Sequence, residues 1–89
     1  MNAIVSVIGR DKVGICAAVC TKMADYRINI LDISQTIMQG NFTMIMAVDL
    51  EQASAPFGEI RDALSQLGEE MGLSIRIQRQ EIFDAMHSI

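Results

Sequence analysis

The chain has 89 residues and a mass of 9.8 kDa, enough for one hydrophobic core, so we expect a single domain over residues 1–89. A net charge of -4 with seven scattered Lys and Arg residues argues against a nucleic-acid-binding protein, which would carry a basic face. No apolar run reaches the roughly 20 residues that span a bilayer, and residues 1–8 lack the features of a signal peptide. We therefore expect a cytoplasmic protein whose partners include neither nucleic acid nor a membrane.

The apolar content is high for a chain of this size. Hydrophobic residues make up 51% of the sequence, whereas a domain of such length buries only about 60% of the surface of its unfolded chain. We therefore expect an apolar surface patch that a partner covers, and a homodimer would supply that partner.

The first predicted elements are a strand over residues 3–8 and a helix that begins near Ile15. β-Branched residues fill the strand, and Gly9 ends it. Asp11 lies in the intervening turn, where it is placed to cap the helix or to precede its cap. Up to Tyr26, apolar side chains recur at the spacings of an amphipathic helix: Ile15, Cys16, Val19, Cys20 and Met23.

The two cysteines of the chain, Cys16 and Cys20, belong to this apolar stripe. Two cysteines four residues apart on one helix rarely reach disulfide geometry. A heavy-metal carrier of this size would need Cys-x-x-Cys ahead of the helix, and the spacing here is different. We expect both cysteines to be small core residues, and we predict no metal site and no cofactor.

The middle of the chain predicts a β-hairpin. Residues 29–39 and 42–50 have β character, and Gln39-Gly40-Asn41 between them is typical of a tight turn. Residues 44–48 are apolar at every position, which again predicts a partner, because helices can cover only one face of a sheet in a two-layer fold. The first strand of the hairpin, residues 29–39, instead has one apolar face: Leu31, Ile33 and Ile37.

The last third of the chain predicts a second helix and a fourth strand. Ser54 is placed to cap the helix, with Pro56 in its first turn, and Gly72 is a stop signal. Residues 73–78 alternate between apolar and polar, as in a half-buried strand, and residues 82–89 predict a short C-terminal helix. The helix itself has a regular apolar stripe: Phe57, Ile60, Leu64, Leu67 and Met71.

The order of these elements is β-α-β-β-α-β. With right-handed crossovers it predicts the α+β ferredoxin-like sandwich, in which two helices pack on one face of a four-stranded antiparallel sheet.

The turn from Gly9 to Ile15 is the candidate functional element. A glycine-bounded turn at a helix N-terminus presents backbone N–H groups and the positive end of the helix dipole, which suits a carboxylate or a phosphate, although many such turns are purely structural. A phosphate-binding loop is excluded, because Ile15 and Cys16 stand where Lys and Ser or Thr are required.

Catalytic constellations are absent from the sequence. The single histidine, His87, has no acid or nucleophile at a readable spacing. An acylphosphatase-like hydrolase would have an arginine at the helix start, where Ala17 and Ala18 stand, so that Arg10 is the one candidate substitute. We therefore expect a non-enzymatic protein.

The turn and the predicted second strand together resemble the ACT domain, a small ligand-binding regulatory module of amino-acid metabolism. More narrowly, the chain is similar to free-standing ACT proteins of an uncharacterised bacterial and archaeal group, and to the halves of the glycine-cleavage repressor. The resemblance covers essentially the whole chain and rests on these residues: Gly9, Asp11, Gly14, Ile15, Asn29-Ile30, Asp32-Ile33-Ser34-Gln35-Thr36, Phe42-Thr43-Met44 and residues 82–87.

The resemblance implies a homodimer that binds a small amino acid at its interface and signals to a partner protein. Backbone groups of one subunit's turn would hold the ligand carboxylate, and Asn29 of the other subunit would complete the site. Val13 stands where many members of the family have proline. A ligand-free assembly module and the hydrolase remain the alternative functions. The implied ligand-binding residues are Asp11, Lys12, Val13, Gly14, Ile15, Asn29 and Ile30.

Overall fold

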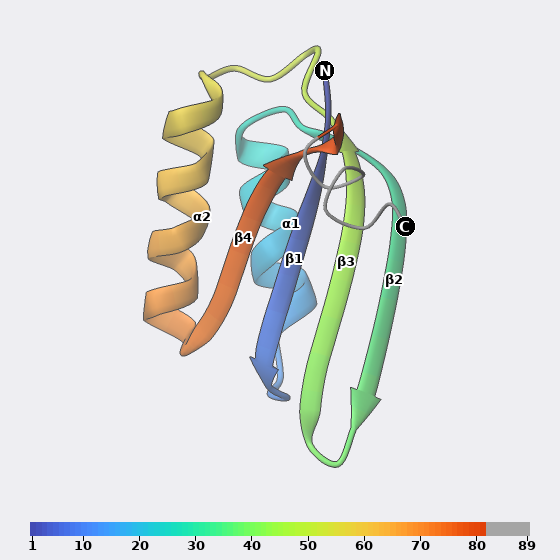
Figure 1. The fold of residues 1–89 in the computed structure, drawn as a ribbon. Helices are drawn as coiled ribbons and strands as arrows, with labels where there is room; N and C mark the ends of the chain where they lie inside the picture. Colours follow the sequence, from blue (N-terminus) through green and yellow to red (C-terminus); the bar gives the residue numbers. More distant parts are fainter. Residues whose placement is uncertain (82–89) are drawn as a thin grey trace.

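The computed structural model describes residues 1–81. Its four strands form one antiparallel sheet in the order β2-β3-β1-β4, and both helices cover the same face of that sheet (Figure 1). This is the predicted ferredoxin-like sandwich, while the predicted C-terminal helix lies outside the described residues. The elements are β1 (Asn2–Arg10), α1 (Ile15–Asp25), β2 (Asn29–Met38), β3 (Asn41–Asp49), α2 (Phe57–Met71) and β4 (Leu73–Arg79).

The core lies between the sheet and the helices. Alternate residues of β1 and β3 point toward the helices, which contribute the apolar stripes that their sequence periodicity predicts. The side chains that meet there are almost fully buried: Ala3, Val5, Val7, Met44, Met46 and Val48 from the strands, and Ile15, Val19, Met23, Ile60 and Leu64 from the helices.

Several predicted boundaries and caps were wrong. β1 continues past Gly9 to Arg10, because both residues pair with β3. Gly14, with φ of 90°, is the N-cap of α1, so Asp11 lies too far ahead of the helix to cap it. α2 begins at Phe57 with Pro56 as its extended N-cap and has no hydrogen bond from a capping side chain, so the predicted cap is also wrong. The predicted end of α1 near Tyr26 and the stop at Gly72 are confirmed.

The predicted hairpin between β2 and β3 is confirmed. Gln39 and Gly40 connect the strands, and both have positive φ, 53° and 79°. Two successive residues with positive φ match the right-handed twist of the flanking strands, which is why short hairpins favour them.

The two edges of the sheet are β2 and β4, and the helices leave β2 largely uncovered. Every residue from Leu31 to Met38 is exposed, although the ladder puts Ile33 and Ile37 on the same face as the core residues of β3. An irregularity between Ile30 and Asp32 shifts the register of the strand. Figure 1 shows β2 at the edge farthest from α2. The apolar face predicted for this strand therefore exists but has no cover within the described chain.

Candidate functional site

The candidate turn is held between the hairpin and α2. The backbone N–H of Asp11 donates to the carbonyl oxygen of Gly40 at 2.8 Å. The ammonium group of Lys12 donates to the carbonyl oxygen of Met71, in the last turn of α2, where a cation also offsets the negative end of the helix dipole. Sequence reasoning missed both contacts, because they join segments that only the tertiary fold brings together.

The N-terminus of α1 is well suited to an anion. Its first N–H groups have no acceptor within the helix, and among residues 1–81 no side chain caps it and no acidic residue occupies its first turn. Ile15 is buried and anchors this end in the core, whereas Val13 projects fully into solvent. A carboxylate placed here would meet backbone donors and the positive end of the dipole.

Asn29 lies at the other end of the sheet. It opens β2 and pairs with Asp49, whereas the turn follows the end of β1, beside the β2–β3 hairpin. At about 3.3 Å per residue, the ten residues of β2 separate these ends by roughly 30 Å. Asn29 is exposed, and the neighbouring Ile30 is half-buried against the core. One chain therefore does not bring the two predicted halves of the site together.

Arg10 is not part of the helix N-terminus. It is the last residue of β1, and the alternation that turns Val5 and Val7 toward the helices places Arg10 on the opposite face. Its guanidinium lies near Gly40 in the hairpin. This placement removes the geometric basis for a hydrolase that would use Arg10 at the start of α1.

The cysteines are not the buried pair that the sequence predicts. Cys16 is exposed and Cys20 is half-buried, because Cys16 lies one helical step outside the buried line of Ile15 and Val19. The Cys16 sulfur is 3.7 Å from Oε1 of Gln35 on β2. Partial burial, together with the neighbouring Cys16 thiol, raises the pKa of the Cys20 thiol.

This difference predicts selective alkylation. At a pH just below the usual thiol pKa of about 8.5, iodoacetamide should modify Cys16 several times faster than Cys20, because Cys20 is less accessible and holds its proton more strongly. The difference between the two alkylation rates should become smaller as the pH rises through the range in which Cys20 ionises. Peptide mass spectrometry over time measures both rates, with the urea-unfolded protein as the control in which they become similar. Equal rates in the folded protein would contradict the prediction.

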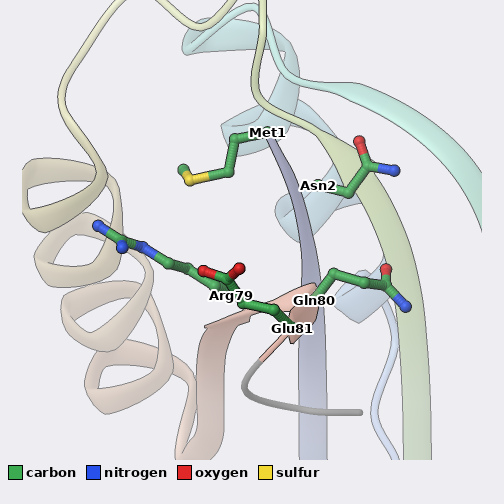
Figure 2. A pocket seen from close by; sticks show the side chains of 5 residues that line it. All are labelled: Met1, Asn2, Arg79, Gln80 and Glu81. Atoms are coloured by element: carbon green, nitrogen blue, oxygen red, sulfur yellow. The ribbon is translucent and has the colours of Figure 1, made fainter. Parts of the chain in front are cut away.

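Two surface hollows lie away from the candidate turn. One, of about 310 Å³, is lined by Met1, Asn2, Arg79, Gln80 and Glu81, where the start of β1 meets the end of β4 (Figure 2). The other, of about 370 Å³, lies between α2 and β4, where the guanidinium of Arg79 is 5.5 Å from the ring centre of Phe57.

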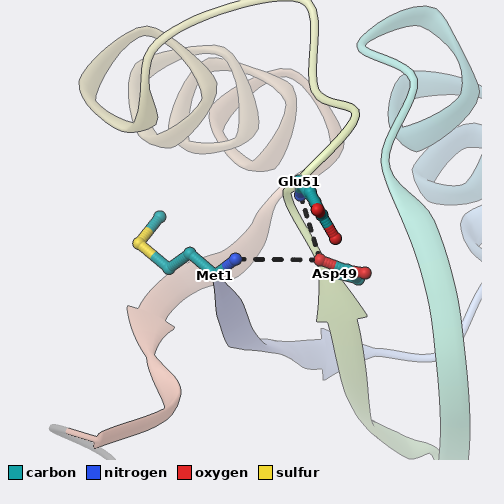
Figure 3. A network of polar contacts seen from close by, with 3 residues as sticks. All are labelled: Met1, Asp49 and Glu51. Carbon is teal, nitrogen blue, oxygen red and sulfur yellow. Dashed lines mark hydrogen bonds and ion pairs between the residues drawn. The ribbon is translucent and has the colours of Figure 1, made fainter.

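The first hollow adjoins a small polar network. The amino group of Met1 is 3.8 Å from Oδ1 of Asp49, which also accepts a hydrogen bond from the backbone N–H of Glu51 at 3.0 Å (Figure 3). These contacts join the start of β1 to the end of β3. They give the network an evident structural role.

Among residues 1–81, no three His, Cys, Asp or Glu side chains gather in a group that could hold a metal ion. Neither of the described helices combines the length and apolar character needed to cross a membrane.

The comparisons with known proteins agree with the resemblance seen in the sequence. The pattern of the ACT domain matches residues 2–78. A UPF0237 protein of Listeria innocua is 51% identical over 89 residues, which is 100% of both chains. The structure of an ACT domain protein from Streptococcus pneumoniae has a TM-score of 0.82 at 38% identity and covers 94% of each chain.

A more distant structure shares the fold. A putative glycine cleavage system transcriptional repressor has a TM-score of 0.76 at 22% identity, and the match covers 89% of this chain and 45% of the repressor. The resemblance to one half of such a repressor is thereby confirmed at the level of architecture. On its sequence, its fold and its relatives, the chain belongs to the ACT domain family.

Proposed function

We propose that the protein is a homodimeric regulatory module that binds a small amino acid between its subunits and passes the bound state to a partner protein. One observation carries the proposal: the two halves of the candidate site lie at opposite ends of an exposed edge strand. Two copies related by a twofold axis would bring these halves together. The subunit's own fold keeps them apart.

The edge strand β2 provides the geometry. When two β2 strands pair antiparallel around a twofold axis, the start of each lies beside the end of the other. Asn29 of one subunit then approaches the β2–β3 hairpin of the second subunit. In that hairpin the carbonyl oxygen of Gly40 accepts a hydrogen bond from the backbone N–H of Asp11, in the turn. Such pairing would also satisfy the open backbone groups of the edge and cover Ile33 and Ile37.

The chemistry of the two halves suits an amino acid. The N–H groups at the start of α1 would bind the carboxylate, and the Asn29 amide would bind the ammonium group or share the carboxylate, because an amide both donates and accepts. Asp11, Val13, Gly14 and Ile15 shape the first half through their backbone. Lys12 links that half of the site to α2, because its ammonium group donates a hydrogen bond to the carbonyl oxygen of Met71.

A thermal-shift panel of the twenty amino acids tests the proposal. A ligand at 100 times its Kd stabilises the folded protein by about 2.7 kcal/mol, which raises Tm by roughly 10 °C or more in a domain of this size. Asn29→Ala should abolish the response and leave the dimer intact. Asn2→Ala is the matched control, since it also removes an exposed asparagine from the first position of a strand. A panel in which no amino acid shifts Tm would contradict the binding proposal.

The second candidate function is a ligand-free assembly module. The observation that favours it is the extent of exposed apolar surface, which requires a partner but no small molecule. A stable dimer that responds to no amino acid would support this function, and a monomer at micromolar concentration in light scattering would contradict both. The exposed apolar side chains include Ile8, Leu31, Ile33, Ile37, Met38 and Ile45.

A further inference from the structure

Ile4 is buried on the face of the sheet that α1 and α2 do not cover. Ala3 and Val5 belong to the core between sheet and helices, so the alternation of β1 turns Ile4 to the opposite face. Both helices lie on the other side of the sheet (Figure 1). Ile4 is nevertheless only 6% exposed, whereas Ile8, on the same strand and the same face, is 52% exposed.

The neighbours of these two isoleucines within the sheet do not explain the difference. Side chains of a strand stand roughly perpendicular to the sheet, so neighbours on one face shield the sides of an isoleucine and leave its tip open. Burial of Ile4 therefore requires a cover that lies over this face. The residues that flank the two isoleucines across the ladder are small or polar in both cases: Ala47 and Gln78 beside Ile4, and Thr43 and Ser74 beside Ile8.

We infer that residues 82–89 of the same chain provide this cover, as a short helix packed across the outer face of the sheet at Ile4. The described part of the chain ends at Glu81, which lies beside Met1 and Asn2, at the end of β1 nearest Ile4 (Figure 2). Half of the eight residues that follow are large and apolar, and their spacing places them on one side of a helix: Ile82, Phe83, Met86 and Ile89.

The length of this segment matches the pattern of exposure. Eight helical residues span about 12 Å, whereas at roughly 3.3 Å per residue Ile8 lies about 20 Å along β1 from Asn2. A helix that starts beside Asn2 therefore covers Ile4, about 7 Å along the strand, and stops short of Ile8. Such a helix is about 10 Å thick. Because stacked sheets are also about 10 Å apart, it prevents a second copy from stacking its sheet on this part of the face.

Nuclear Overhauser effects in the full-length protein test the inference. We expect contacts from the ring protons of Phe83 or the methyl group of Met86 to the δ1 methyl group of Ile4. A filtered experiment on an equal mixture of ¹³C-labelled and unlabelled protein separates contacts within a chain from contacts between chains. The absence of any contact between residues 82–89 and Ile4, or contacts that occur only between chains, would overturn the inference.

Two variants of the same segment give an independent measurement. Phe83→Asp places a charge on the apolar side of the inferred helix, so it should lower Tm by several degrees and shift the methyl signal of Ile4. Ser88→Asp adds the same charge on the polar side and should change neither. Equal effects of the two substitutions on Tm would contradict the docking. No bound amino acid enters these measurements, so the inference and the proposed regulatory function can fail separately.

Discussion

Replacing Ile33 with lysine should convert the proposed dimer to a monomer of about 9.8 kDa. Ile33 lies near the middle of β2, so a twofold axis through that edge would bring each new lysine close to its counterpart in the second subunit. Like charges juxtaposed in an interface cost several kcal/mol, and about 2.7 kcal/mol already weakens association 100-fold. Multi-angle light scattering over a concentration series measures the change.

Ile45→Lys is the control for this prediction. Ile45 is 40% exposed and Ile33 is 41% exposed, but Ile45 lies on β3, on the face of the sheet away from the helices. If the subunits pair through the edge, only the change at Ile33 should dissociate them. A monomer in the Ile45 variant beside a dimer in the Ile33 variant would show that the subunits associate through the sheet face instead.

Two glycines of α2 should respond to alanine in opposite directions. A Cβ at Gly68 would lie 2.6 Å from the carbonyl oxygen of Leu73, a backbone atom that cannot move without displacing β4. Overpacking of this kind costs about 1–3 kcal/mol, which exceeds the gain of up to about 1 kcal/mol from better helix propensity. Gly68→Ala should therefore lower the free energy of unfolding and lower Tm by several degrees.

Gly58→Ala provides the matched control in the same helix. The nearest atom to its added Cβ would be a guanidinium nitrogen of Arg61, at 3.8 Å, which is ordinary contact with a mobile side chain. Here only the propensity gain remains, and the variant should be more stable by about 0.5–1 kcal/mol. Urea unfolding curves of the two variants compare them directly. Stabilisation by both substitutions would show that β4 moves enough to accommodate the added Cβ at Gly68.

Local signals were enough to predict most of the fold. The spacing of Ile60, Leu64 and their neighbours specified α2, and the turn residues Gln39 and Gly40 specified the hairpin, because each feature depends on residues close in sequence. The caps failed where two local rules competed. Gly14 took the position for which Asp11 was a candidate, and Pro56 began α2 where Ser54 was expected to cap it.

The candidate site was less predictable, because its features depend on distant segments. The periodicity of α1 gave no reason to distinguish Cys16 from the buried residues of the helix. Its exposure depends on where β2 and β3 lie beneath the helix. The apolar face of β2 was readable, but the fact that the helices leave it open was not. The separation of Asn29 from the turn follows from the antiparallel order of the strands.

The unlike edges of the sheet would also limit the self-association proposed above. β2 carries a single charged side chain, Asp32, and is open to pairing, whereas β4 carries Arg76 and Arg79, both exposed. Charged side chains along an edge discourage a further strand from adding to it. Pairing of two copies through β2 is isologous, so it occupies the open edge strand of both subunits. The extended sheet then has a β4 strand with its charged side chains at each end. Assembly would then stop at the dimer, and pairing through β2 would not lead to a filament.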